Sequence, residues 1–124
     1  MLDEAYRLVE EFQYKAGHPV NEKPTLMIKS RAFVRYKCMH DELDEFITAS
    51  NIYEQADSIM DLIYYAIGTL VELGVHPDDL FLLLHEYNMK KVQFVENDES
   101  GRVKKPSWWH HPDEEIKRII DDMI

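Results

Sequence analysis

The sequence predicts an all-α fold, with a helical hairpin at the core of a domain of four or five helices. Apolar residues recur at intervals of three and four along each predicted segment, as on one face of an α-helix. The alternation of apolar and polar residues that is typical of β-strands occurs nowhere in the chain. Because the chain has only 124 residues, we expect residues 1–124 to form a single domain that oligomerisation completes.

The first predicted helix spans residues 2–15. Asp3 and Glu4 lie in its first turn, where the helix dipole favours acidic side chains. Its expected apolar face consists of Leu2, Ala5, Leu8, Val9 and Phe12. Gly17 ends this helix, and two prolines predict an extended connector over residues 18–29.

The next two helices form the hairpin, with a tight turn at Ser50–Asn51. The first begins near Ser30, and its expected core line is Ala32, Tyr36, Met39, Leu43 and Phe46. The second runs from about Ile52 to Leu73, and its expected core line is Ile52, Ala56, Ile59, Ile63, Ile67 and Leu70. Gly74 suits a left-handed C-cap, and Gly68 predicts the close approach of another helix.

Pro77 suits the first position of a fourth helix, which is apolar on all sides from Leu80 to Leu84. A helix of this kind is normally buried. Because the chain is too short to cover every side of it, we expect a second subunit and therefore a homo-oligomer, either a dimer or a tetramer. The last helix begins at Pro112, and its apolar stripe is Ile116, Ile119, Ile120 and Met123.

The formal net charge of −10 argues against binding to nucleic acid or to an anionic membrane through bulk electrostatics. No apolar run approaches the roughly 20 residues of a membrane span, and we expect no signal peptide. The single cysteine, Cys38, excludes an internal disulfide and fits a reducing compartment. We therefore expect a cytoplasmic protein.

Four carboxylates are expected to converge in the hairpin. Glu42 and Glu45 share a face of its first helix, and Asp57 and Asp61 share a face of its second. Glu45 and Asp57 each lie six residues from Asn51, whereas Glu42 lies nine before it and Asp61 ten after it. In an antiparallel pair, these residues stand at matching heights.

Carboxylates that converge repel one another unless a cation joins them, and hard divalent cations prefer oxygen ligands. We therefore predict a Mg²⁺ site, with Mn²⁺ as the alternative ion. The metal ligands predicted from this geometry are Glu42, Glu45, Asp57 and Asp61. Ordinary solvated surface acids are the competing interpretation. The composition favours the metal, because residues 38–89 contain eleven acids and no Lys or Arg. The acids also share helix faces with apolar residues that are expected in the core, so we expect them to be half-buried.

Few other residues suggest chemistry. His85, Asn88 and Lys91 recur every three residues and can face one site. The competing interpretation is that Lys90 and Lys91 only stabilise the C-terminus of their helix through its dipole. Trp108 and Trp109 can stack on a base, but packing onto the core is the more common use. No Gly-rich phosphate loop is present in the sequence.

The signature Glu42-x-x-Glu45, followed on the next helix by Asp61-Leu-Ile-Tyr-Tyr-Ala-Ile-Gly-Thr-Leu, resembles the MazG-like all-α NTP pyrophosphohydrolase superfamily. Segments 84–91 and 105–108 are similar to its phosphoribosyl-ATP pyrophosphohydrolase-like branch. The resemblance implies Mg²⁺-dependent hydrolysis of an NTP or dNTP between the α and β phosphates, which gives a monophosphate and pyrophosphate. It implies metal ligation by Glu42, Glu45 and Asp61. The residues implied to contact the nucleotide are Asn88, Lys91 and Lys105.

In the expected reaction, the cation lowers the pKa of the attacking water. Glu45 or Glu54 accepts the proton of this water, and Lys91 offsets charge on the phosphates. One position departs from the family pattern, because many relatives have glutamate three residues before the aspartate and this chain has Ser58. Glu54 and Asp57 share that face and can substitute for it.

Two other classes of protein compete with this interpretation. A di-iron carboxylate protein requires Glu-x-x-His pairs, and none occurs at the right place. A catalytically silent nucleotide-binding or partner-binding module with the same fold stays open, because Ser58 replaces a carboxylate.

Overall fold

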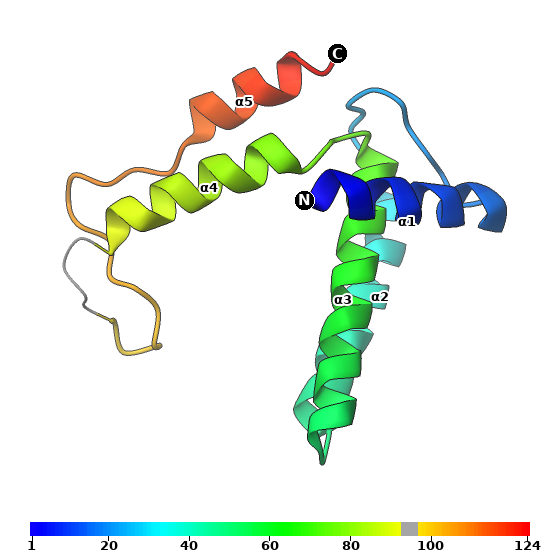
Figure 1. Cartoon of the computed structure of the whole chain (residues 1–124), viewed down its shortest axis with the longest axis horizontal. Helices are drawn as coiled ribbons and strands as arrows, with labels where there is room; N and C mark the ends of the chain where they lie inside the picture. The colour runs from blue at the N-terminus through cyan, green and yellow to red at the C-terminus, as the bar shows by residue number, and fades with distance from the viewer. Residues whose placement is uncertain (93–96) are drawn as a thin grey trace. The chain divides into compact units, whose positions relative to one another are not determined.

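The computed structural model describes residues 1–92 and 97–124, and in this part of the chain it contains five helices (Figure 1). They are α1 (Leu2–Ala16), α2 (Lys29–Thr48), α3 (Ile52–Leu73), α4 (Asp78–Lys91) and α5 (Asp113–Asp121). The β-structure found in the same residues is one isolated bridge between Asn97 and Val103. The all-α prediction is therefore confirmed.

The chain divides into two compact units, Met1–His76 and Pro77–Ile124. In the first unit, α2 and α3 form the predicted antiparallel hairpin, and α1 crosses α3 near the end away from the turn (Figure 1). The core between α1 and α3 consists of Tyr6, Val9, Ile67 and Val71. The prediction of a single domain stays a prediction.

The hairpin turn lies where the sequence placed it. Asn51 is the N-cap of α3, and its side chain accepts a hydrogen bond of 2.9 Å from the backbone N–H of Glu54. The Glu54 carboxylate in turn accepts a hydrogen bond of 3.2 Å from the N–H of Ser50. This arrangement differs from a capping box only in that Glu54 accepts from the residue before the N-cap and not from the N-cap itself. It fixes the register at which the carboxylates of the two helices face each other.

The predicted C-cap of α3 is also confirmed, because Gly74 has a φ of 71°. The connector from α1 to α2 is bound at this end of α3. The N–H of Asn21 donates to the carbonyl of Val71 at 3.2 Å, and that of Thr25 donates to the carbonyl of Leu73 at 2.8 Å. A Cβ atom at Gly74 would collide with the carbonyl of Lys23, so the connector can lie this close only beside a glycine.

The expected core lines of the hairpin are wrong for the chain by itself. On α2, Tyr36 is 56% exposed and Leu43 is 48% exposed, whereas Arg35 is buried. On α3, Ile52 is exposed, although Ile67 is buried as expected. The apolar spacing therefore identified apolar stripes on both helices, but much of each stripe faces outward in the single chain.

Gly68 is explained differently from the prediction. The group beside it is the guanidinium of Arg35, which a Cβ at position 68 would meet, and not the backbone of another helix. The sequence correctly indicated a close approach. It could not show that a long polar side chain makes it.

In the second unit, α4 packs against α5. The indole N–H of Trp109 donates to the carbonyl of Tyr87 at 2.7 Å, and the Tyr87 hydroxyl donates to Glu115 at 3.1 Å. Helix α4 begins one residue later than expected, with Pro77 as its N-cap. No residue of α4 is buried, and Phe81 and Leu82 are each about half exposed. The expectation that α4 is buried is therefore wrong for one chain.

In the described residues, no single helix is long and apolar enough to cross a membrane. Helices α3 and α4, which are separated by a bend, reach the necessary length and apolar composition only when they are counted together.

Candidate metal centre

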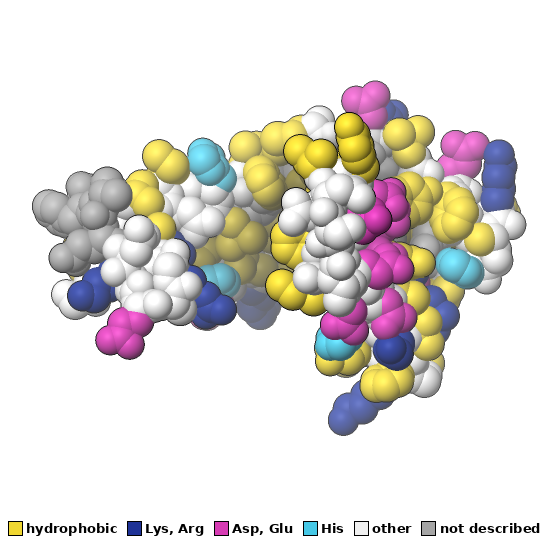
Figure 2. Space-filling model, turned by 90° about the horizontal axis from the view of Figure 1, so that it is seen from below, with side chains coloured by type: hydrophobic (Ala, Val, Ile, Leu, Met, Phe, Trp, Pro, Cys, Tyr) yellow, Lys and Arg dark blue, Asp and Glu magenta, His cyan; other side chains and the backbone are white. Residues whose placement is uncertain are grey.

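The predicted carboxylates come from facing positions of the hairpin. Glu42 and Glu45 lie on α2, and Asp57 and Asp61 lie on α3. Only Glu42 and Asp61 are half-buried, whereas Glu45 and Asp57 are exposed, so the expected half-burial of the whole set is wrong for the outer pair. Figure 2 looks onto the hairpin from its turn and shows acidic side chains gathered along it, bordered by hydrophobic ones.

Glu42 is the carboxylate most affected by its surroundings. Burial raises its pKa to about 7, with further contributions from a hydrogen bond and charge repulsion with Glu45 and from the charges of Asp61 and Asp57. Burial also raises the pKa of Asp61, as do the charges of Asp57 and Glu45. The four acids are thus close enough to repel one another.

One oxygen of Glu42, Oε2, is buried and has no hydrogen-bond partner. Nearly all buried polar atoms in folded proteins are hydrogen-bonded, so an exception calls for a missing partner. The neighbours of this carboxylate are other acids, which makes a cation the fitting partner. The donor set, which consists of carboxylate oxygens, suits Mg²⁺ or Mn²⁺.

A cavity of about 270 Å³ lies next to this group, toward the turn. Its lining is Glu45, Thr48, Ala49, Glu54, Asp57 and Ser58. Ser58 is buried, and its hydroxyl donates to the carbonyl of Glu54 at 2.9 Å. Three of the predicted acids, Glu45, Glu54 and Asp57, therefore line one cavity together with the serine that stands in a carboxylate position.

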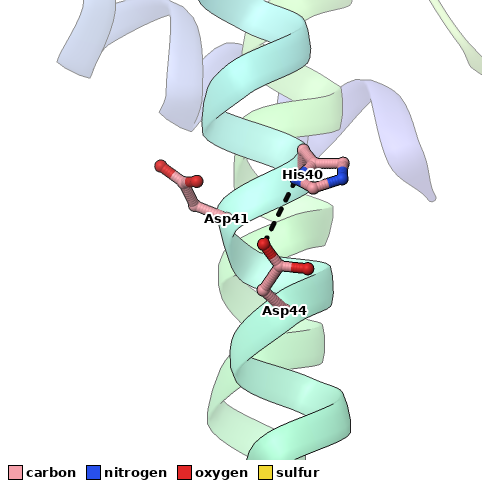
Figure 3. Close-up of side chains that lie close together, drawn as sticks. All are labelled: His40, Asp41 and Asp44. Carbon is pink, nitrogen blue, oxygen red and sulfur yellow. Dashed lines mark ion pairs between the residues drawn. The ribbon is translucent and has the colours of Figure 1, made fainter.

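The tightest group of possible ligands is a different one. His40, Asp41 and Asp44 have ligand atoms within 4.8 Å of one another, and all three come from α2 (Figure 3). Ordinary ion pairs account for them, because His40 lies 3.3 Å from Asp44 and Lys37 lies 2.7 Å from Asp41. In the described residues, no three of the predicted carboxylates come this close together.

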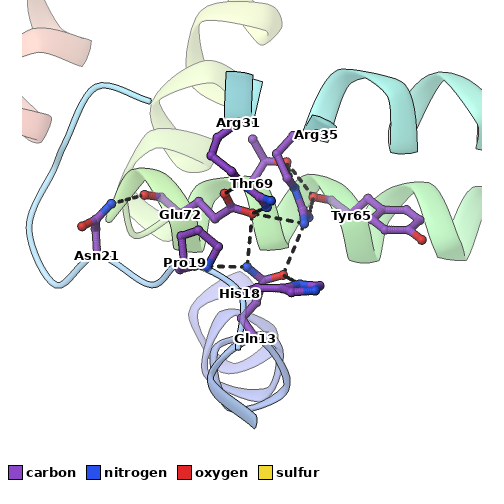
Figure 4. Close-up of polar contacts among 9 residues, drawn as sticks. All are labelled: Gln13, His18, Pro19, Asn21, Arg31, Arg35, Tyr65, Thr69 and Glu72. Atoms are coloured by element: carbon purple, nitrogen blue, oxygen red, sulfur yellow. Dashed lines mark hydrogen bonds and ion pairs between the residues drawn. The ribbon is translucent and has the colours of Figure 1, made fainter. Parts of the chain in front are cut away.

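Sequence reasoning missed a buried polar network at the other end of the hairpin (Figure 4). Glu72 is 2% exposed and forms two hydrogen bonds with Arg31, of 3.0 and 2.8 Å. Arg35 lies 3.2 Å from the same carboxylate and donates to the carbonyl of Tyr65 at 2.8 Å. Gln13 of α1 also donates to Glu72, at 3.4 Å. The available signal was the pair of arginines four residues apart on α2.

The residues implied to contact a nucleotide lie in the second unit. Asn88, Lys91 and Lys105 line one cavity of about 740 Å³, so the structure brings these three together. His85, which recurs at the same spacing on α4, is not among the lining residues. The ammonium groups of Lys91 and Lys105 lie 4.6 and 5.5 Å from the centre of the Trp109 ring.

Comparison with known proteins identifies the family of the chain. The sequence pattern of the phosphoribosyl-ATP pyrophosphohydrolase family matches residues 9–88, which is more than half of the chain. The chain belongs to this family. The match confirms the resemblance seen in the sequence. No curated protein matches the chain significantly.

Membership of the phosphoribosyl-ATP pyrophosphohydrolase family supports a hydrolase that acts on phosphoanhydrides. The matched residues run from α1 to Asn88 and therefore include every acid of the hairpin and the buried network. Lys91 and Lys105 lie beyond the match.

Proposed function

We propose that the protein is a metal-dependent pyrophosphohydrolase that cleaves the α–β phosphoanhydride of an NTP or dNTP. The products would be a nucleoside monophosphate and pyrophosphate. The observation that supports this most directly is the unpartnered, buried Oε2 of Glu42 among three further carboxylates. An uncompensated group of this kind is costly to keep unless it binds a cation.

Glu42, Glu45, Asp57 and Asp61 would hold the ion. A bound Mg²⁺ would supply charge neutralisation on the phosphate oxygens and a water of lowered pKa. Glu45 and Glu54 face the cavity at the turn, and one of them accepts the proton of the attacking water.

Asn88, Lys91 and Lys105 would contact the nucleotide in this proposal, because they line one cavity and two of them are cations. Lys91 would offset charge on the phosphates. The protein would act as a homo-oligomer. Support for this comes from outward apolar side chains on three helices, including Phe33 of α2, Tyr53 of α3 and Phe81 of α4.

The alternative is a catalytically silent module that binds nucleotides or a partner. Ser58 favours it, because the serine places a hydroxyl already bonded to the Glu54 carbonyl where a ligand carboxylate is expected. Both candidates predict binding of metal or nucleotide. Only the enzyme predicts products.

The deciding experiment incubates purified protein and Mg²⁺ with a panel of NTPs, dNTPs and phosphoribosyl-ATP, and separates pyrophosphate from orthophosphate. Monophosphate plus pyrophosphate, lost on chelation and in Glu42→Gln, is the expected result. Asp41→Asn is the matched control, because it removes an exposed carboxylate one residue away on α2. Absence of turnover with every nucleotide would leave the silent module.

A further inference from the structure

The outward side of α2 carries a long, mainly apolar stripe. Its members are spaced alternately by three and four residues: Phe33, Tyr36, His40, Leu43 and Ile47. The four apolar members are 48–78% exposed, and the His40 side chain is 45% exposed. Figure 3 shows His40 on α2, with α3 behind that helix. This spacing is typical of a helix that packs lengthwise against another helix, and an exposed apolar stripe of this length marks an interaction surface.

The two ends of this stripe differ in shape. A depression of about 710 Å³ at its N-terminal end is lined by Lys29, Ser30, Ala32, Phe33 and Tyr36. Residues 29, 32, 33 and 36 are spaced like the four residues that form the hole in knobs-into-holes packing between helices. Ile47, at the other end, is the most exposed member of the stripe. One helix therefore carries both a hole and a knob.

The stripe is symmetric about His40, which lies at its centre. Phe33 lies seven residues before His40, and Ile47 lies seven residues after it. When two copies of α2 lie antiparallel with His40 on a two-fold axis, Ile47 of each copy stands opposite the depression on the other. Tyr36 and Leu43 of different copies then face each other on either side of the axis. Contacts in which the same patch serves both copies are the commonest type in homodimers.

The charges of α2 favour the antiparallel orientation. Residues 29–40 contain four Lys and Arg residues and no acid, whereas residues 41–48 contain four acids and no Lys or Arg. Lys37 and Asp44 lie on the same flank of the stripe, so in the antiparallel pair centred on His40 they meet between the two copies. In a parallel pair, each would face its own copy, and like charges repel. Within one chain, both side chains already form exposed ion pairs on α2. Such pairs contribute little to stability, so they can be exchanged.

We propose that α2 forms an antiparallel pair with α2 of a second copy of this chain, with His40 on the two-fold axis. The hole and the knob, the symmetry of the stripe and the charge pattern support the same orientation and register. The inference rests on the homo-oligomer in the proposed function, which it deepens by assigning the interface. It requires neither metal nor nucleotide, because no member of the stripe is proposed to bind either.

Disulfide cross-linking tests the position of the axis. Cys38→Ser removes the native thiol, and His40→Cys is then introduced and oxidised with copper phenanthroline. The thiols at position 40 should form a disulfide between two copies, because a residue on a two-fold axis lies next to its own copy. Asp41→Cys in the same background is the matched control, because Asp41 is also exposed but lies off the stripe. It should cross-link far less.

The same assay separates the antiparallel pair from a parallel one. Phe33→Cys and Ile47→Cys, each alone in the Cys38→Ser background, should not cross-link. A mixture of the two proteins should cross-link after their subunits have exchanged, because these positions meet across the interface. In a parallel pair, each variant would cross-link with itself and the mixture would give no disulfide between the two variants.

Sedimentation equilibrium of variants tests the contacts themselves. Ile47→Glu should weaken self-association by roughly 100-fold or more, because each dimer loses two buried Ile side chains. Tyr14→Glu is the matched control, since Tyr14 of α1 is as exposed as Ile47 but lies off the stripe. Lys37→Asp should weaken the dimer, and its combination with Asp44→Lys should restore it. His40→Leu should strengthen the dimer by making the axis apolar, a gain that misfolding cannot produce.

A wild-type chain that is monomeric at the concentrations used for turnover assays would overturn the inference. A dimer that Ile47→Glu leaves unchanged, or that cross-links through Asp41→Cys as readily as through His40→Cys, would do the same. These outcomes are distinguishable from failure of the proposed function. Pyrophosphate release by a protein that does not cross-link at position 40 would remove the interface alone. Cross-linking at position 40 without turnover of any nucleotide would remove the hydrolase and leave the interface.

Discussion

The half-buried carboxylate of Glu42 predicts an unusual effect of pH and of mutation on stability. Its pKa in the folded chain is about 7, against an ordinary value of 4.5. The folded state therefore holds this proton more tightly than the unfolded state does. As pH rises from about 4.5 to 7, the unfolded chain releases the proton first, and the metal-free protein loses stability.

The magnitude follows from the difference of about 2.5 pKa units, at about 1.36 kcal/mol for each. Ionisation of Glu42 should therefore cost about 3 kcal/mol of folding stability above about pH 7.5, and less than about 1 kcal/mol near pH 5. Glu42→Gln removes this charge while keeping the shape. The variant should be more stable than the wild type at the higher pH, by an amount approaching that figure, and nearly equal to it at the lower pH.

The assay is urea unfolding followed by helical circular dichroism, in EDTA at both pH values. Addition of Mg²⁺ at the higher pH should stabilise the wild type and have little effect on Glu42→Gln, because the variant lacks the ligand whose charge the cation compensates. Asp41→Asn should show no comparable dependence on pH, since its carboxylate is exposed. A Glu42→Gln variant that is equally destabilised at both pH values would refute the reasoning.

Three further predictions concern the hairpin. Glu72→Gln should lower the free energy of unfolding by about 3 kcal/mol in urea titrations, because it leaves the charges of Arg31 and Arg35 uncompensated; an unchanged midpoint would contradict the role given to the pair. Gly68→Ala should cost about 1–3 kcal/mol in the same assay, since the new methyl group displaces the Arg35 guanidinium, whereas a gain in stability would show that the side chain moves freely. Ser58→Glu should tighten Mg²⁺ binding measured by calorimetry, and unchanged affinity would show that position 58 does not reach the ion.

Local signals made the helices and the turn predictable. The hairpin turn follows from the Asn51 side chain and the Glu54 carboxylate, which act within four residues of each other. The end of α3 follows from Gly74, which adopts a left-handed conformation at little cost. Such signals depend on neighbours in the sequence, so a single chain contains all that they require.

The candidate site was partly predictable for the same reason. Helical periodicity and distance from the turn sufficed to bring Glu42, Glu45, Asp57 and Asp61 together. The degree of burial was not predictable. Only the packed hairpin shows that Glu42 lies inside with an unpartnered oxygen while Glu45 and Asp57 stay exposed.

The sequence by itself determined the helical class, the position of the turn, the family and the facing pairs of carboxylates. The tertiary structure decided which face of each helix is covered. It buried Arg35 of α2 and Glu72 of α3, whereas Tyr36 and Leu43, which were expected in the core, are exposed. It also placed Lys91 and Lys105 against the ring of Trp109. The physical reason is that periodicity records which residues share a face, whereas burial depends on which distant segment, or which second chain, packs against that face.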